Sequence, residues 1–355
     1  AAKLRHALSS DVAVDDLRAR AERDFRAVRG ELIRVARDLW PAFVGGQPAP
    51  DDDDEVVRRV WLAVATEHPS AEGLLDACRR ETAAIEAFVR ETGLIALPDA
   101  PLRITWTPEF LRPYGGAFLS PPGPLDRGLM SEFWITPPDP SWPPERLESY
   151  LREENDRMLR VLCIHEAIPG HYLQLERSNR TPSLARAVFQ SGMFAEGWAV
   201  YVTQVMMDRG YGADDPALML AHWKYYLRAV TNTLLDIGIH VDDMDEAAAM
   251  TLMVGGAFQE EQEARAKYLR GRLSSTQLCT YYVGSLEMWD LELAARRRAA
   301  EQAGAGADVV AEPPLVGGFG PTPGFDQRAH LEAVIAHGCP PIHWVRSILE
   351  EAGAA

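Results

Sequence analysis

Apolar residues spaced three and four positions apart recur along most of the chain, and this spacing restricts it to a mainly helical fold. Over 16–40 the apolar positions are Leu17, Ala21, Phe25, Val28, Leu32, Ala36 and Leu39. The same spacing predicts helices at about 56–67 and 71–92. It returns at 145 and continues, with breaks, to about 300, and a final helix is expected over about 326–352.

The stretch 94–145 has a different composition, because proline and glycine become dense. Its short pieces "LRITWTP", "GGAFLSPP" and "SEFWITPP" are β-prone and bounded by turn residues. They predict a small antiparallel β element at about 100–136, beside the helix that carries the candidate active site. We therefore expect a helical N-terminal portion, 1–93, and a catalytic helical region with a small sheet, 94–355, in one continuous compact unit.

Composition excludes several classes of function. The chain has 355 residues, 47% of them hydrophobic, which is enough for a large core. The formal charge of −16 argues against nucleic acid and anionic membrane surfaces as partners. The longest weakly polar run, 247–258, is shorter than the ~20 residues of a membrane span, so no transmembrane helix is predicted. The acidic run 51–55 is interpreted as a solvated loop that caps the next helix.

The four cysteines lie far apart without a CxxC pair, which predicts neither a disulfide framework nor a cysteine-ligated zinc site. A cytoplasmic location is the default expectation. The chain begins with "AAKLRHALSS" rather than Met, which leaves open a missing N-terminal region and export. The sequence does not indicate the oligomeric state.

Residues 165–174, "HEAIPGHYLQ", contain the strongest candidate for chemistry. An apolar stripe on the preceding helix points His165 inward; its members are Leu147, Leu151, Met158 and Leu162. An isolated inward histidine is most simply a hydrogen-bonded core residue. Here Glu166 follows directly and His171 lies six positions on, so a metal site is the alternative.

A regular helix cannot bring these two histidines together, because residues six apart diverge by about 120°. Pro169 has no N–H to donate to the carbonyl of His165, and Gly170 accepts irregular backbone angles, so the pair predicts a bulge. Extrusion of two residues would give an effective spacing of four. His165 and His171 would then face one cation, with Glu166 placed to take a proton from a bound water.

A catalytic zinc needs a third protein ligand, and Glu196 in the apolar helical segment "MFAEGWAVYVTQVM" is the candidate. The alternatives for this carboxylate are a helix N-terminal position or a buried salt bridge with an arginine. Asp236 and His240 are four apart in "LLDIGIH", and Tyr281 and Tyr282 lie in an apolar helical segment. A tyrosine hydroxyl or a protonated His240 near the metal could stabilise an oxyanion, and for the tyrosines core packing is the alternative.

At these motifs the sequence resembles the bacterial proteins catalogued as domain of unknown function 885, which look like gluzincin-type zinc metallopeptidases. The matching segments are "HEAIPGHYLQ", "EGWAVY", "DIGIH", "QLCTYYVG" and "GFDQRAHLEAVIAHGCPP". The resemblance implies zinc held by His165, His171 and Glu196, with Glu166 as general base and acid. It also implies that Tyr281 and His240 contact the oxyanion or the substrate.

The resemblance further implies an edge strand within 114–136 that pairs with an extended peptide substrate through Gly116 and Ala117. Tyr282 is a further candidate for substrate binding. The segment "EARAKYLRGRLSSTQ" matches the family pattern loosely, so either Arg265 or Arg270 is the candidate for a substrate-binding arginine.

The sequence therefore predicts a hydrolase that binds one zinc ion and acts on a peptide or a small amide. Two alternatives stay open: a non-catalytic binding protein on a peptidase-like scaffold, and an amidase that acts on a small molecule in biosynthesis. Retention of Glu166 favours an enzyme, since binding alone requires no general base.

Overall fold

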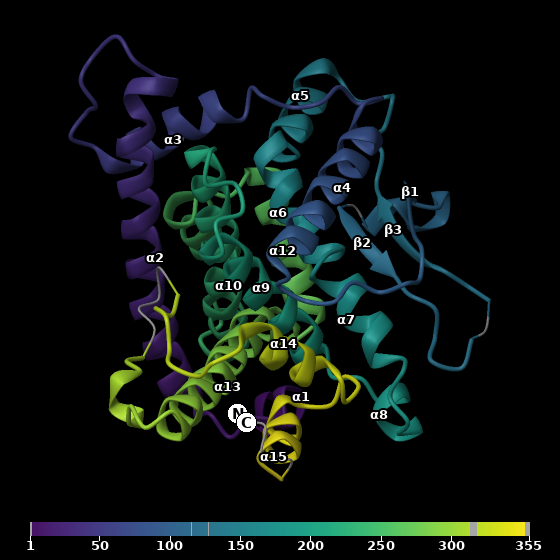
Figure 1. Ribbon diagram of the computed structural model, residues 1–355. Helices are drawn as coiled ribbons and strands as arrows, with labels where there is room; N and C mark the ends of the chain where they lie inside the picture. Colours follow the sequence, from purple (N-terminus) through teal and green to yellow (C-terminus); the bar gives the residue numbers. More distant parts are fainter. Residues whose placement is uncertain (1, 115, 127, 313–317, 352–355) are drawn as a thin grey trace.

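Helices form most of the structure, and a small sheet lies at one side (Figure 1). The computed structural model describes residues 2–114, 116–126, 128–312 and 318–351. The mainly helical fold expected from the apolar spacing is confirmed. Within the described residues, no helix is both long enough and apolar enough to cross a membrane.

The elements follow one another along the chain in four groups. The N-terminal helices are α1 (Ala2–Leu8), α2 (Val14–Phe43), α3 (Asp53–Val64) and α4 (Leu74–Thr92). The sheet region contains β1 (Leu102–Trp106), η1 (Glu109–Tyr114), β2 (Ala117–Ser120) and β3 (Ser131–Ile135). The central helices are α5 (Pro144–Glu153), α6 (Asp156–Glu166), α7 (His171–Ser178), α8 (Leu184–Val188), α9 (Gly192–Asp208) and α10 (Pro216–Val241). The remainder comprises α11 (Glu246–Met250), η2 (Thr251–Gly256), α12 (Glu261–Leu273), η3 (Gln277–Cys279), α13 (Thr280–Gln302), η4 (Ala307–Val309), α14 (Gln327–Ile335) and α15 (Ile342–Glu351).

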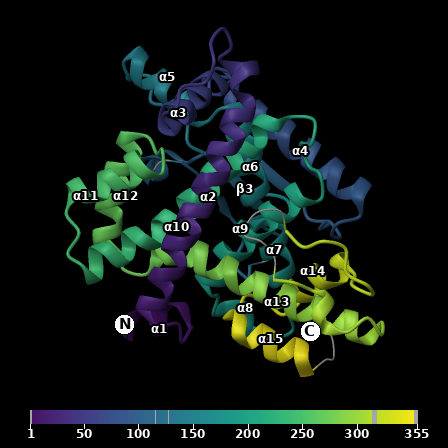
Figure 2. The ribbon, with the colours of Figure 1, turned by 90° about the vertical axis from the view of Figure 1, so that its left-hand side faces the viewer.

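Helices α9, α10 and α13 form the centre of the molecule, with α2 packed along α10 on one side and the sheet on the other (Figures 1 and 2). The crossing of α9 and α13 is very close, because a Cβ at Gly197 would lie 2.4 Å from the carbonyl carbon of Gly284. The largest fully buried side chains of these helices are Trp198, Trp223, Tyr201 and Tyr282. This packing holds the residue before Gly197, which is Glu196, at a fixed position beside the core.

The sheet has the order β1-β3-β2. Strand β2 pairs antiparallel with β3, as expected, with Ala117 opposite Ile135. Strand β1 instead runs parallel to β3, with Leu102 opposite Ser131, so the sheet is mixed rather than antiparallel. The two parallel strands are joined by a connection that contains η1 and β2. Helix α6 contacts β2, which places an edge of the sheet beside the candidate site.

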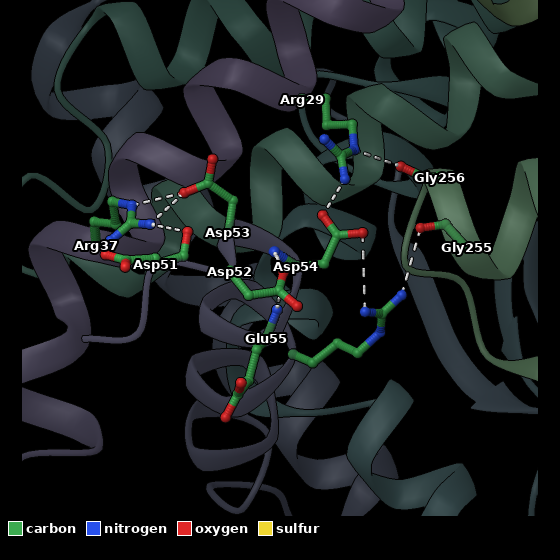
Figure 3. A network of polar contacts seen from close by, with 10 residues as sticks. Arg29, Arg37, Asp51, Asp52, Asp53, Asp54, Glu55, Gly255 and Gly256 are labelled. Carbon is green, nitrogen blue, oxygen red and sulfur yellow. Dashed lines mark hydrogen bonds and ion pairs between the residues drawn. The ribbon is translucent and has the colours of Figure 1, made fainter.

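The acidic run caps α3, as expected: the side chain of Asp52 accepts hydrogen bonds from the backbone N–H groups of Asp54 and Glu55. Figure 3 shows that the run also takes part in a polar network. Arg29 of α2 pairs with Asp54 and donates to the carbonyl of Gly256 at 3.1 Å. The run therefore links α2, α3 and η2 rather than being only solvated.

The expected final helix is divided into α14 and α15. Gly338, between them, has φ +88°, a conformation that side-chain-bearing residues rarely adopt. Pro340 and Pro341 follow and have no N–H to continue a helix. A single helix over 326–352 is therefore wrong. A similar division separates α5 from α6, where Asn155 caps the N-terminus of α6.

Candidate metal centre

The helix that carries His165 ends where Pro169 and Gly170 predict. Helix α6 stops at Glu166 and α7 begins at His171. The N–H of Gly170 donates to the carbonyl of Ile164 at 3.0 Å, six residues back instead of the four of an α-helix. Two residues are therefore extruded between the histidines, which is the local geometry required to turn a spacing of six into a convergent pair.

Gly170 is required by the close approach of the backbone at this break. A Cβ at this position would lie 1.9 Å from the carbonyl oxygen of His165. No other residue type fits without moving that carbonyl, and with it the imidazole of His165. The glycine thus maintains the distance between the two histidines.

Glu196 of α9 lies close to both His165 and His171. The carboxylate oxygen Oε2 of Glu196 lies 3.5 Å from Nε2 of each histidine. Two atoms that are each ~2.1 Å from one tetrahedral zinc ion are roughly 3.4 Å apart, so the observed separations fit such an ion. The imidazole rings are nearly perpendicular, at 77°, with centroids 4.7 Å apart.

Unpaired polar atoms support the same interpretation. Oε2 of Glu196 is buried and has no hydrogen-bond partner among the described residues, since 3.5 Å from each imidazole is too long for a good bond. Burying a carboxylate oxygen in this way is costly unless it is paired or bound to a metal. In the described part of the chain Glu196 pairs with no arginine, and it lies inside α9 rather than at its N-cap, so neither structural alternative applies.

The charged groups of the cluster shift one another's pKa values. Burial alone raises the pKa of Glu196, but the two imidazoles outweigh this and hold that pKa well below its usual range. Burial lowers the pKa of His171, but the carboxylate of Glu196 reverses this and the net change is upward. The carboxylate is therefore ionised at neutral pH, the form that binds a cation.

Glu166 lies beside the two histidines. One ligand atom from each of His165, Glu166 and His171 lies within 4.8 Å of the others. Burial raises the pKa of Glu166, opposed by the imidazoles. Its Oε2 accepts the N–H of Leu119 from β2 at 3.1 Å, while its Oε1 has no partner in the part of the chain that the structure describes. Glu166 is thus positioned either as a proton acceptor or as a further ligand.

Tyr281 is close enough to the cluster for its pKa to be raised by burial and then by the charge of Glu196. Its hydroxyl lies 3.5 Å from the side-chain nitrogen of Gln277. The expected contact of His240 is not at the cluster: its Nε2 lies 2.9 Å from the carbonyl oxygen of Gly271. The "DIGIH" segment of α10 therefore anchors the chain leading to Tyr281.

Asp236 reinforces this anchor. Its carboxylate accepts the backbone N–H of Thr276 at 2.9 and 3.0 Å. Thr276 has φ 73°, an unusual conformation for a residue with a branched side chain. The bond fixes the turn at Thr276 that begins η3, five residues before Tyr281.

Two of the other expected substrate contacts, Tyr282 and Arg265, do not lie at the cluster. Tyr282 is fully buried and its hydroxyl donates to Asp24 on α2, so the structure does not bring it to the cluster. Arg265 is exposed and pairs with Glu246 at 2.6 Å and with Glu261, away from the cluster. The side chain of Arg270 is exposed.

Gly116 and Ala117 lie at the start of β2, at the edge of the sheet. The carbonyl of Gly116 accepts the N–H of Thr136 on the β3 side. In an antiparallel pair successive residues alternate in direction, so the backbone groups of Ala117 and Leu119 point to the other side. Leu119 confirms this, because its N–H reaches Glu166.

Sequence reasoning missed Tyr225, whose hydroxyl lies 2.9 Å from Nδ1 of His165. The two rings are in edge contact, with centroids 5.5 Å apart. Tyr225 precedes Asp236 by eleven residues, a spacing that puts both on one face of α10. That spacing was visible in the sequence, but nothing in it identified His165 as the partner.

Comparison with known proteins gives a family and a fold. A family model described as "Bacterial protein of unknown function (DUF885)" matches residues 1–348. No curated protein matches the chain. A solved structure of a putative lipoprotein of unknown function from Shewanella oneidensis is 33% identical, with a TM-score of 0.84 over 98% of this chain. A putative lipoprotein from Colwellia psychrerythraea is 17% identical, with a TM-score of 0.78 over 99% of this chain. The chain spans 58% and 54% of the lengths of these two proteins.

Proposed function

The chain belongs to the DUF885 family of bacterial proteins of unknown function, and from the geometry of its histidine and glutamate cluster we propose that it is a zinc-dependent hydrolase of peptide or amide bonds. One observation carries the proposal. Nε2 of His165 and of His171 each lie 3.5 Å from a buried oxygen of Glu196 that has no hydrogen-bond partner in the described chain. Two histidines and one carboxylate are also a ligand set found in zinc hydrolases.

The residues around the cluster supply the rest of the chemistry. Zinc, when bound, polarises a carbonyl and lowers the pKa of a bound water toward ~7. Glu166 accepts a proton from the attacking water and delivers it to the leaving amine. Its Oε2 is held by the N–H of Leu119, which leaves Oε1 to receive the proton. The hydroxyl of Tyr281 donates to the developing oxyanion.

The edge of the sheet supports an extended substrate. Strand β2 has its outward backbone groups at Ala117 and Leu119, next to Glu166. Pairing through such groups fixes the direction of a peptide while leaving its side chains free. In its more specific form, the proposal is that the chain is a gluzincin-like metallopeptidase, as the sequence motifs suggest. The cytoplasmic location expected from the sequence stays a prediction.

The test is hydrolysis of a peptide library by three preparations of the purified chain: zinc-loaded, chelator-treated and reloaded. Mass spectrometry of the products identifies the bonds cleaved and whether they lie at an end or inside the peptide. We expect cleavage that disappears on chelation and returns with zinc. Bound zinc with no cleavage of any peptide or small amide would instead favour a binding protein.

A further inference from the structure

Tyr225 is the residue outside the predicted site that has the closest polar contact with it. It lies on α10, partly buried, and its hydroxyl oxygen is 2.9 Å from Nδ1 of His165. Tyr225 packs against the main hydrophobic core, and His165 is only 3% exposed. The hydroxyl therefore meets His165 where little water competes for the bond.

The two nitrogens of His165 have different surroundings. Nε2 points toward Glu196, at 3.5 Å, and Nδ1 points toward Tyr225. A neutral imidazole carries its proton on one nitrogen, so a ring that offers Nε2 to a cation carries the proton on Nδ1. That N–H needs an acceptor, and the hydroxyl oxygen of Tyr225 is at hydrogen-bond distance.

His171 provides an internal contrast. Its Nδ1 is buried but has no hydrogen-bond partner among the described residues. Its Nε2 has the same 3.5 Å distance to Glu196 as that of His165. The surroundings of the two Nδ1 atoms thus differ, because only that of His165 has a hydroxyl group, from Tyr225, at hydrogen-bond distance.

We propose that Tyr225 is a positioning residue that fixes the ring orientation and the tautomer of His165, and so sets the affinity of the cluster for zinc. The inference rests on the proposed function, because it assumes that the cluster binds a metal. Hydrogen bonds of this kind hold metal-ligating histidines in general, and their loss typically weakens metal binding about 10–100-fold.

The experiment compares Tyr225→Phe with the matched control Tyr226→Phe. Tyr226 is the next residue of α10, is likewise aromatic and is more deeply buried than Tyr225, and its ring contacts His222 and Trp223 instead of the cluster. Zinc affinity is measured by competition with a chromophoric chelator. We expect the affinity of Tyr225→Phe to fall about 10–100-fold and that of Tyr226→Phe to stay within a few-fold of the wild type. Circular dichroism establishes that both variants are folded.

A second readout addresses the bond itself. In the zinc-loaded protein with 15N-labelled histidine, the Nδ1–H of His165 should exchange slowly with water in the wild type and in Tyr226→Phe. In Tyr225→Phe it should exchange faster, since its acceptor is gone.

The results distinguish failure of the proposed function from failure of the role of Tyr225. Wild-type protein that binds no zinc overturns the proposed function and this inference with it. Wild-type protein that binds zinc no more tightly than Tyr225→Phe overturns the role of Tyr225 alone.

Discussion

Two glutamates on neighbouring helices, Glu292, which is buried, and Glu196, which is partly buried, have opposite surroundings. Glu292 of α13 accepts the hydroxyl of Tyr201 and pairs with Arg296 at 2.7 Å. Arg296 in turn donates to Gly320 and stacks against two phenylalanine rings. Glu196, on α9, has two imidazoles at 3.5 Å and an oxygen without a hydrogen bond in the described chain. The contrast separates a carboxylate whose partners complete a core from one that lacks such partners, as the proposed metal ligand would.

The same substitution at both positions should have different effects, and the largest effect on stability is expected at Glu292. Glu292→Gln leaves the charge of Arg296 buried without a counter-charge, which typically costs about 3–5 kcal/mol of unfolding free energy. Chemical denaturation of the metal-free protein measures it. The zinc content per folded chain should be unchanged. A loss below about 1 kcal/mol would mean that the ion pair between Glu292 and Arg296 contributes little to stability.

Glu166→Gln should lower turnover about 10²–10⁴-fold, the usual contribution of a general base, while zinc stays bound. Activity on the peptide found by library screening and metal content of the same sample are measured together. If zinc is lost as well, Glu166 is a ligand. Full activity would contradict its assignment as the base.

Glu196→Gln should weaken zinc binding more than 100-fold, because a neutral amide replaces an ionised ligand. The free energy of unfolding of the metal-free protein should change by less than about 1 kcal/mol, since no hydrogen bond is lost and the cost of burying the carboxylate offsets its attraction to the imidazoles. Chelator competition and denaturation measure the two quantities. Destabilisation as large as that of Glu292→Gln would remove the distinction between the two carboxylates.

The smallest effect is a pH dependence. The pKa of His171 is raised above its ordinary 6.5, because Glu196 outweighs the lowering by burial. The stabilisation is therefore fully present below about pH 6.5 and is lost as the pH rises through the higher folded value. Unfolding free energy of the chelated wild type should fall over this range more steeply than that of Glu196→Gln. Equal slopes would show that Glu196 and His171 do not interact.

The local features of the site could be predicted because they depend on nearby residues. Pro169 lacks the N–H of a regular helix and Gly170 tolerates the close approach, so the break follows from two adjacent residues. The helical periodicity likewise gave the mainly helical fold, and the position of Glu196 in an apolar helix followed from its neighbours.

The features that could not be predicted depend on contacts between distant segments. The parallel pairing of β1 with β3 depends on how the connection between them packs. The hydroxyl of Tyr225 meets a histidine sixty residues away, and His240 meets the carbonyl of Gly271. A side chain's type does not reveal which tertiary partner it has. Tyr282, next to Tyr281, faces α2 because consecutive helical residues point about 100° apart.

The metal content of the purified wild-type chain tests the central claim most directly. Elemental analysis after exposure to zinc and removal of the excess should find one zinc ion per chain, and none in Glu196→Gln treated in the same way. Wild-type protein that holds no zinc after this treatment would contradict the account.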